Sequence, residues 1–238
     1  LDGVDIDTET FYTKMVNSKE FFKTSQPSPQ EFLDIFEKVK EKQETLICLS
    51  LSSKLSGTYQ SACLAKDMVD YENIYIVDTL TAAAGIRLLC EVAMNWIGEN
   101  RSVESIVSGL EELKERVHIY AGLDTLEYLA KGGRISKTAA AIGTLASIKP
   151  IICTDHGEVA VAGKTRGVNK ATSIVCEKMQ ADIVDTLYPV YTLYSYGLEN
   201  VEKLESKLDC DVERVRIGST IGVHIGPNAF GVCFVGKL

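Results

Sequence analysis

The chain has 238 residues, of which 45% are hydrophobic and 24% are charged, as is ordinary for a globular protein with a substantial core. Its net charge of −8 argues against a nucleic-acid-binding surface, which normally needs a basic face. No apolar run reaches the roughly 18 residues that a membrane-spanning helix needs, and no signal peptide is recognised.

The first half of the chain alternates between predicted helices and strands. One helix has especially clear signals, because Ser28 and Glu31 form a capping box with Pro29 at the first helical position. Continuous apolar strands separated by helices predict a parallel sheet that is covered on both faces. The predicted helices are 8–16, one beginning at residue 29, 56–69, 81–97 and 103–116, and the predicted strands are 45–51 and 73–79.

Hairpins mixed with helices replace this pattern after about residue 118, which predicts a second domain of α+β type with a mixed sheet. We therefore expect an N-terminal α/β domain over 1–118 and a C-terminal domain over 119–238. Because the first predicted element is a helix, we also expect that an opening strand is missing. The later predictions are strand 118–124, helix 125–131, a small-residue helix from 138, strands 148–153 and 158–164, helix 168–181, strand 190–196, helix 199–208 and two strands around 222–231.

The seven cysteines are scattered and show no CxxC spacing, and most lie beside Ile, Leu or Val. This pattern is typical of reduced thiols that pack as small hydrophobes in a cytoplasmic protein. A zinc site would need clustered Cys and His, whereas the three histidines lie far apart in sequence. We expect a cytoplasmic location and no metal.

The loop from Ser52 to Thr58 is the first of four polar clusters that could carry chemistry. It joins a predicted strand to a predicted helix, and hydroxyl groups beside the unpaired N–H groups of a helix N-terminus favour an anion. The alternative is ordinary helix capping by Ser53 or Ser56, which accounts for one hydroxyl only.

Each of the other three clusters is open to two interpretations. Residues 24–27 either bind a ligand or merely prepare the capped helix. The Lys131–Arg134 segment, together with 164–166, forms either an oxyanion site or a solvated surface, since glycine pairs allow close backbone approach and arginine binds oxyanions. His224, between two glycines at the predicted end of an apolar strand, is either a site residue or a structural one.

The motifs expected of most hydrolases, phosphate-loop proteins and metalloproteases are absent, because GxSxG, GxxxxGK[ST], GxGxxG and HExxH do not occur. Ser56 and His224 could pair as nucleophile and base. No acidic residue is marked by the sequence as the third member of such a triad.

Taken together, the four clusters resemble the DegV family of fatty-acid-binding proteins. The matching segments occur in the order of the family and cover almost the whole chain. They are TSQPSP at 24–29, LSSKLSGTYQSA at 51–62, DTLEYLAKGGRIS at 124–136, IKPII at 148–152, GKTR at 163–166 and IGVHIGPNAFG at 221–231.

The resemblance implies two α/β domains with a long-chain fatty acid bound between them. By motif position, Thr24 and Ser56 would bind the carboxylate, and His224 would lie close to the same head group. Further contacts to the head group or to a partner are implied for Ser53, Gly57, Arg134 and Arg166. Two departures from the family are the missing opening strand and Asn228, which stands where glycine is more usual.

The resemblance also implies a carrier rather than an enzyme. Members of the family present the bound acid to a separate fatty-acid kinase, which makes an acyl phosphate for phospholipid synthesis. No cofactor is implied beyond the fatty acid itself, and transient contact with a membrane surface is compatible with this role. The residues alone leave two alternatives, a serine-dependent hydrolase or acyltransferase using Ser56 and His224, and a phosphorylated-metabolite binding protein using the serine loop and Arg166.

Overall fold

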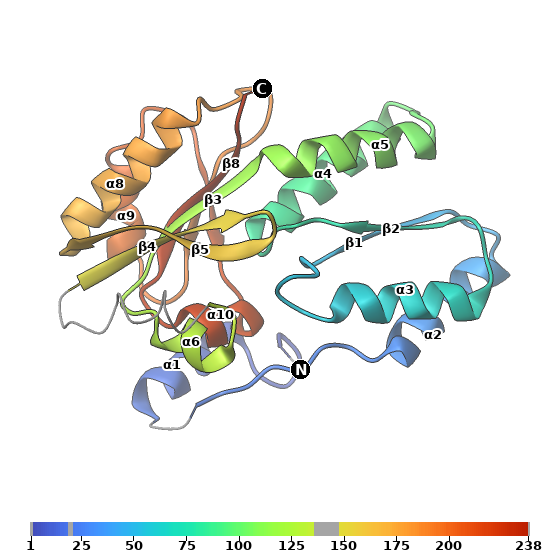
Figure 1. Ribbon diagram of the computed structural model, residues 1–238, viewed down its shortest axis with the longest axis horizontal. Helices are drawn as coiled ribbons and strands as arrows, with labels where there is room; N and C mark the ends of the chain where they lie inside the picture. Colours follow the sequence, from blue (N-terminus) through green and yellow to red (C-terminus); the bar gives the residue numbers. More distant parts are fainter. Residues whose placement is uncertain (1, 19–20, 136–147, 238) are drawn as a thin grey trace. The chain divides into compact units, whose positions relative to one another are not determined.

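The computed structural model describes residues 2–18, 21–135 and 148–237 and divides into two compact units (Figure 1). Unit 1 comprises Leu1–Thr24, Arg116–Asp155 and Val159–Leu238, and unit 2 comprises Ser25–Glu115 and His156–Glu158. Both units contain helices and strands, so the predicted two-domain α/β fold is confirmed.

Unit 2 is built on two parallel strands, β1 (Leu46–Ser50) and β2 (Ile74–Asp78), which pair in register from Leu46 with Ile74 to Ser50 with Asp78. Helices pack on both faces of this sheet, as Figure 1 shows, which is the layering predicted from the apolar strands. On one face lie α2 (Pro29–Glu41) and α3 (Thr58–Val69), and on the other α4 (Ala84–Gly98) and α5 (Val103–Leu113).

The start of α2 follows directly from its sequence. The Ser28 hydroxyl accepts a hydrogen bond from Glu31 N, and the Glu31 carboxylate accepts one from Ser28 N at 2.7 Å, so the predicted capping box is confirmed. The helix then buries Leu33 and Phe36 against α3 and the strand that carries Ile74. This cluster is the core of unit 2 on that face of the sheet.

Unit 1 contains a six-stranded sheet in the order β5-β4-β3-β8-β6-β7. It is mixed, as predicted, because β3 pairs antiparallel with β4 and β8, whereas β6 and β7 run parallel. Its helices α8 (Val168–Ala181) and α9 (Glu199–Glu205) pack against the sheet. The strands are β3 (Val117–Gly122), β4 (Ile148–Asp155), β5 (Glu158–Arg166), β6 (Tyr191–Tyr194), β7 (Glu213–Arg216) and β8 (Phe230–Val235).

The predicted hairpin of β4 and β5 is present, and its turn contains two residues with positive φ, His156 at 45° and Gly157 at 86°. Such a turn matches the right-handed twist of the two strands it joins. The turn residues His156–Glu158 group with unit 2. The structure does not describe residues 136–147, so the small-residue helix predicted from residue 138 lies outside the described residues.

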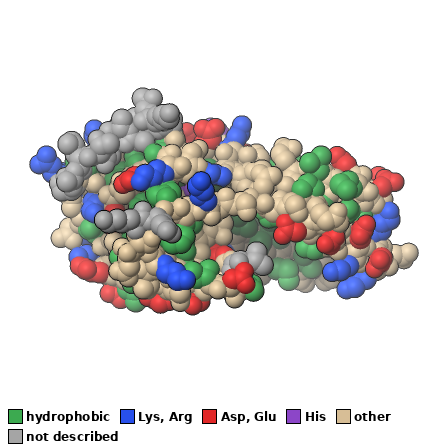
Figure 2. Space-filling view, turned by 90° about the horizontal axis from the view of Figure 1, so that it is seen from below, with side chains coloured by type: hydrophobic (Ala, Val, Ile, Leu, Met, Phe, Trp, Pro, Cys, Tyr) green, Lys and Arg blue, Asp and Glu red, His purple; other side chains and the backbone are tan. Residues whose placement is uncertain are grey.

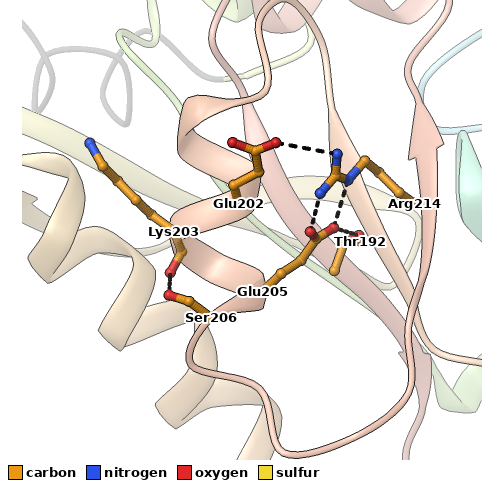
Figure 3. A network of polar contacts seen from close by, with 6 residues as sticks. All are labelled: Thr192, Glu202, Lys203, Glu205, Ser206 and Arg214. Atoms are coloured by element: carbon orange, nitrogen blue, oxygen red, sulfur yellow. Dashed lines mark hydrogen bonds and ion pairs between the residues drawn. The ribbon is translucent and has the colours of Figure 1, made fainter.

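Edge strand β7 is tied to unit 1 by a carboxylate that several side chains share (Figure 3). Glu205 of α9 accepts a hydrogen bond from Arg214 Nε of β7 at 2.9 Å and one from Thr192 Oγ1 of β6 at 2.6 Å. The hydrogen bond with Arg214 is the main cause that lowers the pKa of Glu205, so the carboxylate stays charged and the contact persists.

The N-terminal helix α1 (Thr8–Asn17) belongs to unit 1, which differs from the predicted division at residue 118. It packs against α10 (Ser219–Ile225), and the buried Tyr12 hydroxyl donates a hydrogen bond to Ile217 O, 205 residues away in sequence. Long-range burial therefore decides the unit to which residues 2–24 belong. Local sequence patterns carry no information on such a contact.

Among the residues that the structure describes, no helix is both long and apolar enough to cross a bilayer. Acidic and basic side chains are interspersed on the face shown in Figure 2, without a single block of lysine and arginine. This mixture agrees with the net charge of −8 in giving no basic surface for a nucleic acid on that face.

Candidate functional site

The structure brings together two of the predicted site residues within unit 1. Thr24 Oγ1 lies 2.8 Å from His224 Nε2, which is hydrogen-bonding distance, although the residues are 200 positions apart in sequence. Thr24 lies in a segment without regular secondary structure, and both residues are partly buried. A hydroxyl and an imidazole therefore form one pair, and the resemblance had implied that both residues lie near the same head group.

The prediction that His224 ends a strand is wrong, because it lies in the last turn of the short helix α10. Gly226 ends this helix with φ of +77°, a conformation that favours glycine. Earlier in the helix, Gly222 packs so closely on Tyr12 that a Cβ at this position would lie 2.8 Å from Tyr12 Cζ. Tertiary packing thus stabilises a helix that the apolar, β-branched sequence does not predict.

A glycine of another helix makes room for the His224 ring. Gly132, the last residue of α6 (Glu127–Gly132), lies so near that a Cβ there would come within 3.0 Å of both Nδ1 and Cε1. The Nδ1 atom is buried, and none of the described residues offers it a hydrogen-bond partner. The ring is therefore held between the backbone of α6 and the hydroxyl of Thr24.

Burial, and secondly the nearby Arg134 guanidinium, lower the pKa of His224 below its ordinary value of 6.5. The ring is thus neutral near pH 7. A buried N–H without an acceptor is rarer in proteins than an unpaired acceptor, so we assign the proton to Nε2 and the lone pair to Nδ1. The Nε2–H then donates to Thr24 Oγ1, and the Thr24 hydroxyl hydrogen is left to donate to a ligand.

The lowered pKa predicts how stability depends on pH. The contribution of a neutral His224 to the free energy of unfolding is complete above pH 6.5 and is lost as the pH falls through the lower folded-state pKa. The reason is that the unfolded chain binds a proton that the native ring resists. Urea unfolding of the wild type and of His224→Gln, from about pH 8 to about pH 5, checks this sign. A constant difference between the two proteins across that range would contradict it.

Ser56 lies in unit 2, in the loop between β1 and α3. Its hydroxyl oxygen lies 2.9 Å from Thr58 Oγ1 and accepts a weak hydrogen bond from Thr58 N at 3.3 Å. The N-cap of α3 is Gly57 and has no side-chain capping bond, so capping does not explain the other serines of this loop. The Ser56 hydroxyl is only partly buried, and either it or the Thr58 hydroxyl donates in the hydrogen bond between them.

Three of the other predicted contact residues contact neighbouring protein groups, and the fourth, Arg166, is exposed. Ser53 donates its backbone N–H to Asp78 Oδ1 at 3.1 Å, and a Cβ on Gly57 would overlap the Gln26 side-chain amide. The Arg134 guanidinium donates to the backbone carbonyl of Gly132, which places its charge near His224. Arg166 is the last residue of β5 and is exposed.

Two residues, one in each unit, were not singled out from the sequence for the contacts that they make. Gly132 was noted only as one of a glycine pair that permits close approach, and its partner proves to be His224. Ser52 is fully buried and bonds to the carbonyl oxygen of Gly157, 105 residues away in sequence. Only a spatial contact could have shown either role.

No group of three or more metal-ligating side chains occurs among the described residues. The seven cysteines are all free thiols, and burial raises the pKa of the Cys48 thiol to about 11. His224 and Ser56 belong to different units, and the Nε2 atom of His224 already contacts Thr24.

Comparison with known proteins places the chain in a family. A family model with the description "Uncharacterised protein, DegV family" matches residues 1–237. A DegV domain-containing protein from Caldanaerobacter subterraneus is 36% identical over 242 residues, which cover 99% of this chain and 86% of that protein. The chain therefore belongs to the DegV family.

Solved structures agree in fold and indicate what two relatives bind. A DegV family protein from Thermus thermophilus, described as binding fatty acid, superposes with a TM-score of 0.88 at 30% identity. A stearic acid-binding protein from Eubacterium ventriosum gives the same TM-score at 29% identity. Each comparison covers 99% of this chain and 86% of the other.

Proposed function

We propose that this protein binds a long-chain fatty acid and that Thr24, Ser56 and His224 bind its carboxylate. The observation that carries the proposal is the contact between Thr24 and a partly buried, neutral His224, which, with the proton on Nε2, leaves the Thr24 hydroxyl hydrogen to donate to a ligand. Fatty acid binding by the Thermus thermophilus and Eubacterium ventriosum relatives supports the choice of ligand. His224 acts by orienting Thr24 as well as by lying near the head group.

The chemistry of these residues suits a carboxylate that is held and released. Neutral hydroxyl donors each contribute about 1.5–3 kcal/mol to a charged acceptor. An acyl chain contributes about 0.8 kcal/mol for each buried CH₂, so roughly ten methylenes outweigh the whole head group. In this proposal the chain supplies most of the affinity, and the hydroxyls fix the orientation of the acid.

We also infer that the bound acid is the substrate of a separate fatty-acid kinase, which forms the acyl phosphate. Arg134 and Arg166, with Ser53 and Gly57, are proposed as contacts to the head group or to that partner. Arginine suits both roles because its planar guanidinium binds carboxylate and phosphate in bidentate fashion. The protein itself is proposed to be a carrier without catalytic activity or cofactor.

Extraction of protein purified without detergent, followed by mass spectrometry, is expected to find a bound fatty acid. In calorimetry with stearic acid, Thr24→Ala is expected to bind about tenfold more weakly than the wild type, through the loss of one hydrogen bond to a charged acceptor. Thr13→Ala provides the matched control, since Thr13 is an exposed threonine on α1 of the same unit. This control should bind like the wild type.

Other outcomes would replace the proposal. Wild-type protein that carries no fatty acid and binds none in the calorimeter would overturn it. Ester turnover that is lost in Ser56→Ala, together with a covalent adduct on Ser56, would make the protein a serine-dependent hydrolase or acyltransferase. A phosphorylated metabolite in the extract would make it a binding protein for that class.

A further inference from the structure

Ser52 is the centre of the hydrogen bonds that shape the loop leading to Ser56. Its side chain is completely buried, and its backbone N–H donates to Thr81 O at 3.0 Å. Its own carbonyl oxygen accepts from the N–H groups of Leu55 at 3.0 Å and of Ser56 at 3.2 Å. The backbone of Ser56 is therefore hydrogen-bonded directly to that of Ser52.

The Ser52 hydroxyl connects this loop to a distant part of the chain within unit 2. It donates to Gly157 O at 2.7 Å and accepts from Lys54 N at 3.3 Å, so both hydrogen-bonding functions of the hydroxyl are used. Gly157 is one of the turn residues His156–Glu158 that group with unit 2. The loop after β1 is thus braced by residues that follow it by about a hundred positions.

Only glycine fits at position 157, beside Ser52. Gly157 has φ of +86°, and a Cβ at this position would lie 2.7 Å from Ser52 Oγ and 3.0 Å from Leu80 Cδ2. Any side chain there would push Ser52 away and would also strain the backbone. Conversely, loss of the Ser52 oxygen would leave the buried Gly157 carbonyl without its donor, which is costly in a protein interior.

We propose that Ser52 and Gly157 are positioning residues for Ser56: the Ser52–Gly157 hydrogen bond holds the loop in the conformation that presents the Ser56 hydroxyl to the ligand. The inference rests on the proposed function, because it assigns a purpose to the geometry of a carboxylate-binding residue. It adds two residues that touch no ligand themselves. Their effect on binding passes through the backbone bond between Ser52 O and Ser56 N.

A double-mutant cycle with stearic acid separates positioning from general damage. Ser52→Ala is expected to weaken binding about tenfold in the wild-type background, as for the loss of one hydrogen bond to a charged acceptor. In a Ser56→Ala background, the same change is expected to alter the affinity by less than about twofold, because the group that it positions is gone. Gly157→Ala should likewise weaken binding only when Ser56 is present, because its added Cβ would push the Ser52 side chain away. This variant keeps the inference testable if Ser52→Ala does not fold.

Thr172→Ala is the matched control for lost stability. Thr172 is fully buried in unit 1, and its hydroxyl donates to Asn169 O of its own helix at 2.9 Å. It should lower the melting temperature without changing affinity. Equal losses of affinity in both Ser56 backgrounds for Ser52→Ala and Gly157→Ala would overturn this inference while leaving the proposed function intact. A wild type that binds no fatty acid would overturn both.

Discussion

Gly132→Ala is expected to weaken fatty-acid binding about ten- to hundredfold, which corresponds to the loss of one strong hydrogen bond to the carboxylate. The added methyl group would lie within 3.0 Å of Nδ1 and Cε1 of His224, so the ring must shift and leave Thr24. The backbone itself tolerates alanine, because Gly132 is helical and alanine favours a helix. Calorimetry with stearic acid measures the change.

Gly98→Ala is the matched control for this substitution. Gly98 also ends a helix, and nothing lies within 4 Å of the position that its Cβ would occupy. It should bind like the wild type and be equally stable or slightly more so. If Gly132→Ala bound stearic acid with unchanged affinity, the orientation of His224 by α6 would be irrelevant to the ligand. The role proposed for the Thr24–His224 pair would then be wrong.

The largest effect on stability is expected for Phe36→Ala in α2. Phe36 is 1% exposed and packs in the core cluster that α2 forms with α3 and the two-stranded sheet. Removing a buried aromatic ring loses its transfer free energy and leaves a cavity, which costs about 3–5 kcal/mol. Denaturant unfolding, followed by a signal from unit 2, measures the loss.

The neighbouring residue provides the control for this experiment. Ile35 is 53% exposed on the same helix, so Ile35→Ala should change the free energy of unfolding by no more than about 0.5 kcal/mol. Equal losses for the two variants would mean that α2 is not packed as described. The pair tests the face on which α2 buries its apolar residues.

Local signals in the sequence were sufficient for most elements of the fold. The capping box at Ser28 predicts the start of α2, and α5 begins at the predicted residue 103, directly after Ser102, whose hydroxyl accepts a hydrogen bond from Ser105 N. These features depend on residues within four positions of one another, so they are visible without the fold.

Features that depend on distant contacts were missed or mistaken. The helix α10 is only seven residues long, and it depends on Gly222 meeting Tyr12 from the other end of the chain. The same contact explains why residues 2–24 belong to unit 1. Burial of side chains that are far apart in sequence leaves no periodic trace in either segment.

For the candidate site residues, too, local sequence signals and distant contacts gave different information. The residues alone left each cluster open to two interpretations, and the roles expected of Thr24, Ser56 and His224 followed from the resemblance of their motifs to the DegV family. The structure adds the partners of these residues, Gly132 for His224 and Ser52 with Gly157 for the Ser56 loop. Motifs indicate candidate ligand-binding residues, and only the fold shows which residues contact them.

The assignment of residues 2–24 to unit 1 has a consequence for protein synthesis. Domains generally fold as units as the chain emerges from the ribosome, N-terminal first. Helix α1 emerges early, yet its partner α10 is made some two hundred residues later, so Tyr12 must remain without its hydrogen bond to Ile217 until then. Most of unit 2 can fold in the interval, although the Ser52 hydroxyl cannot form its hydrogen bond to Gly157 O until Gly157 has been made. Helix α1 is thus buried only after α10, which is made much later, has emerged.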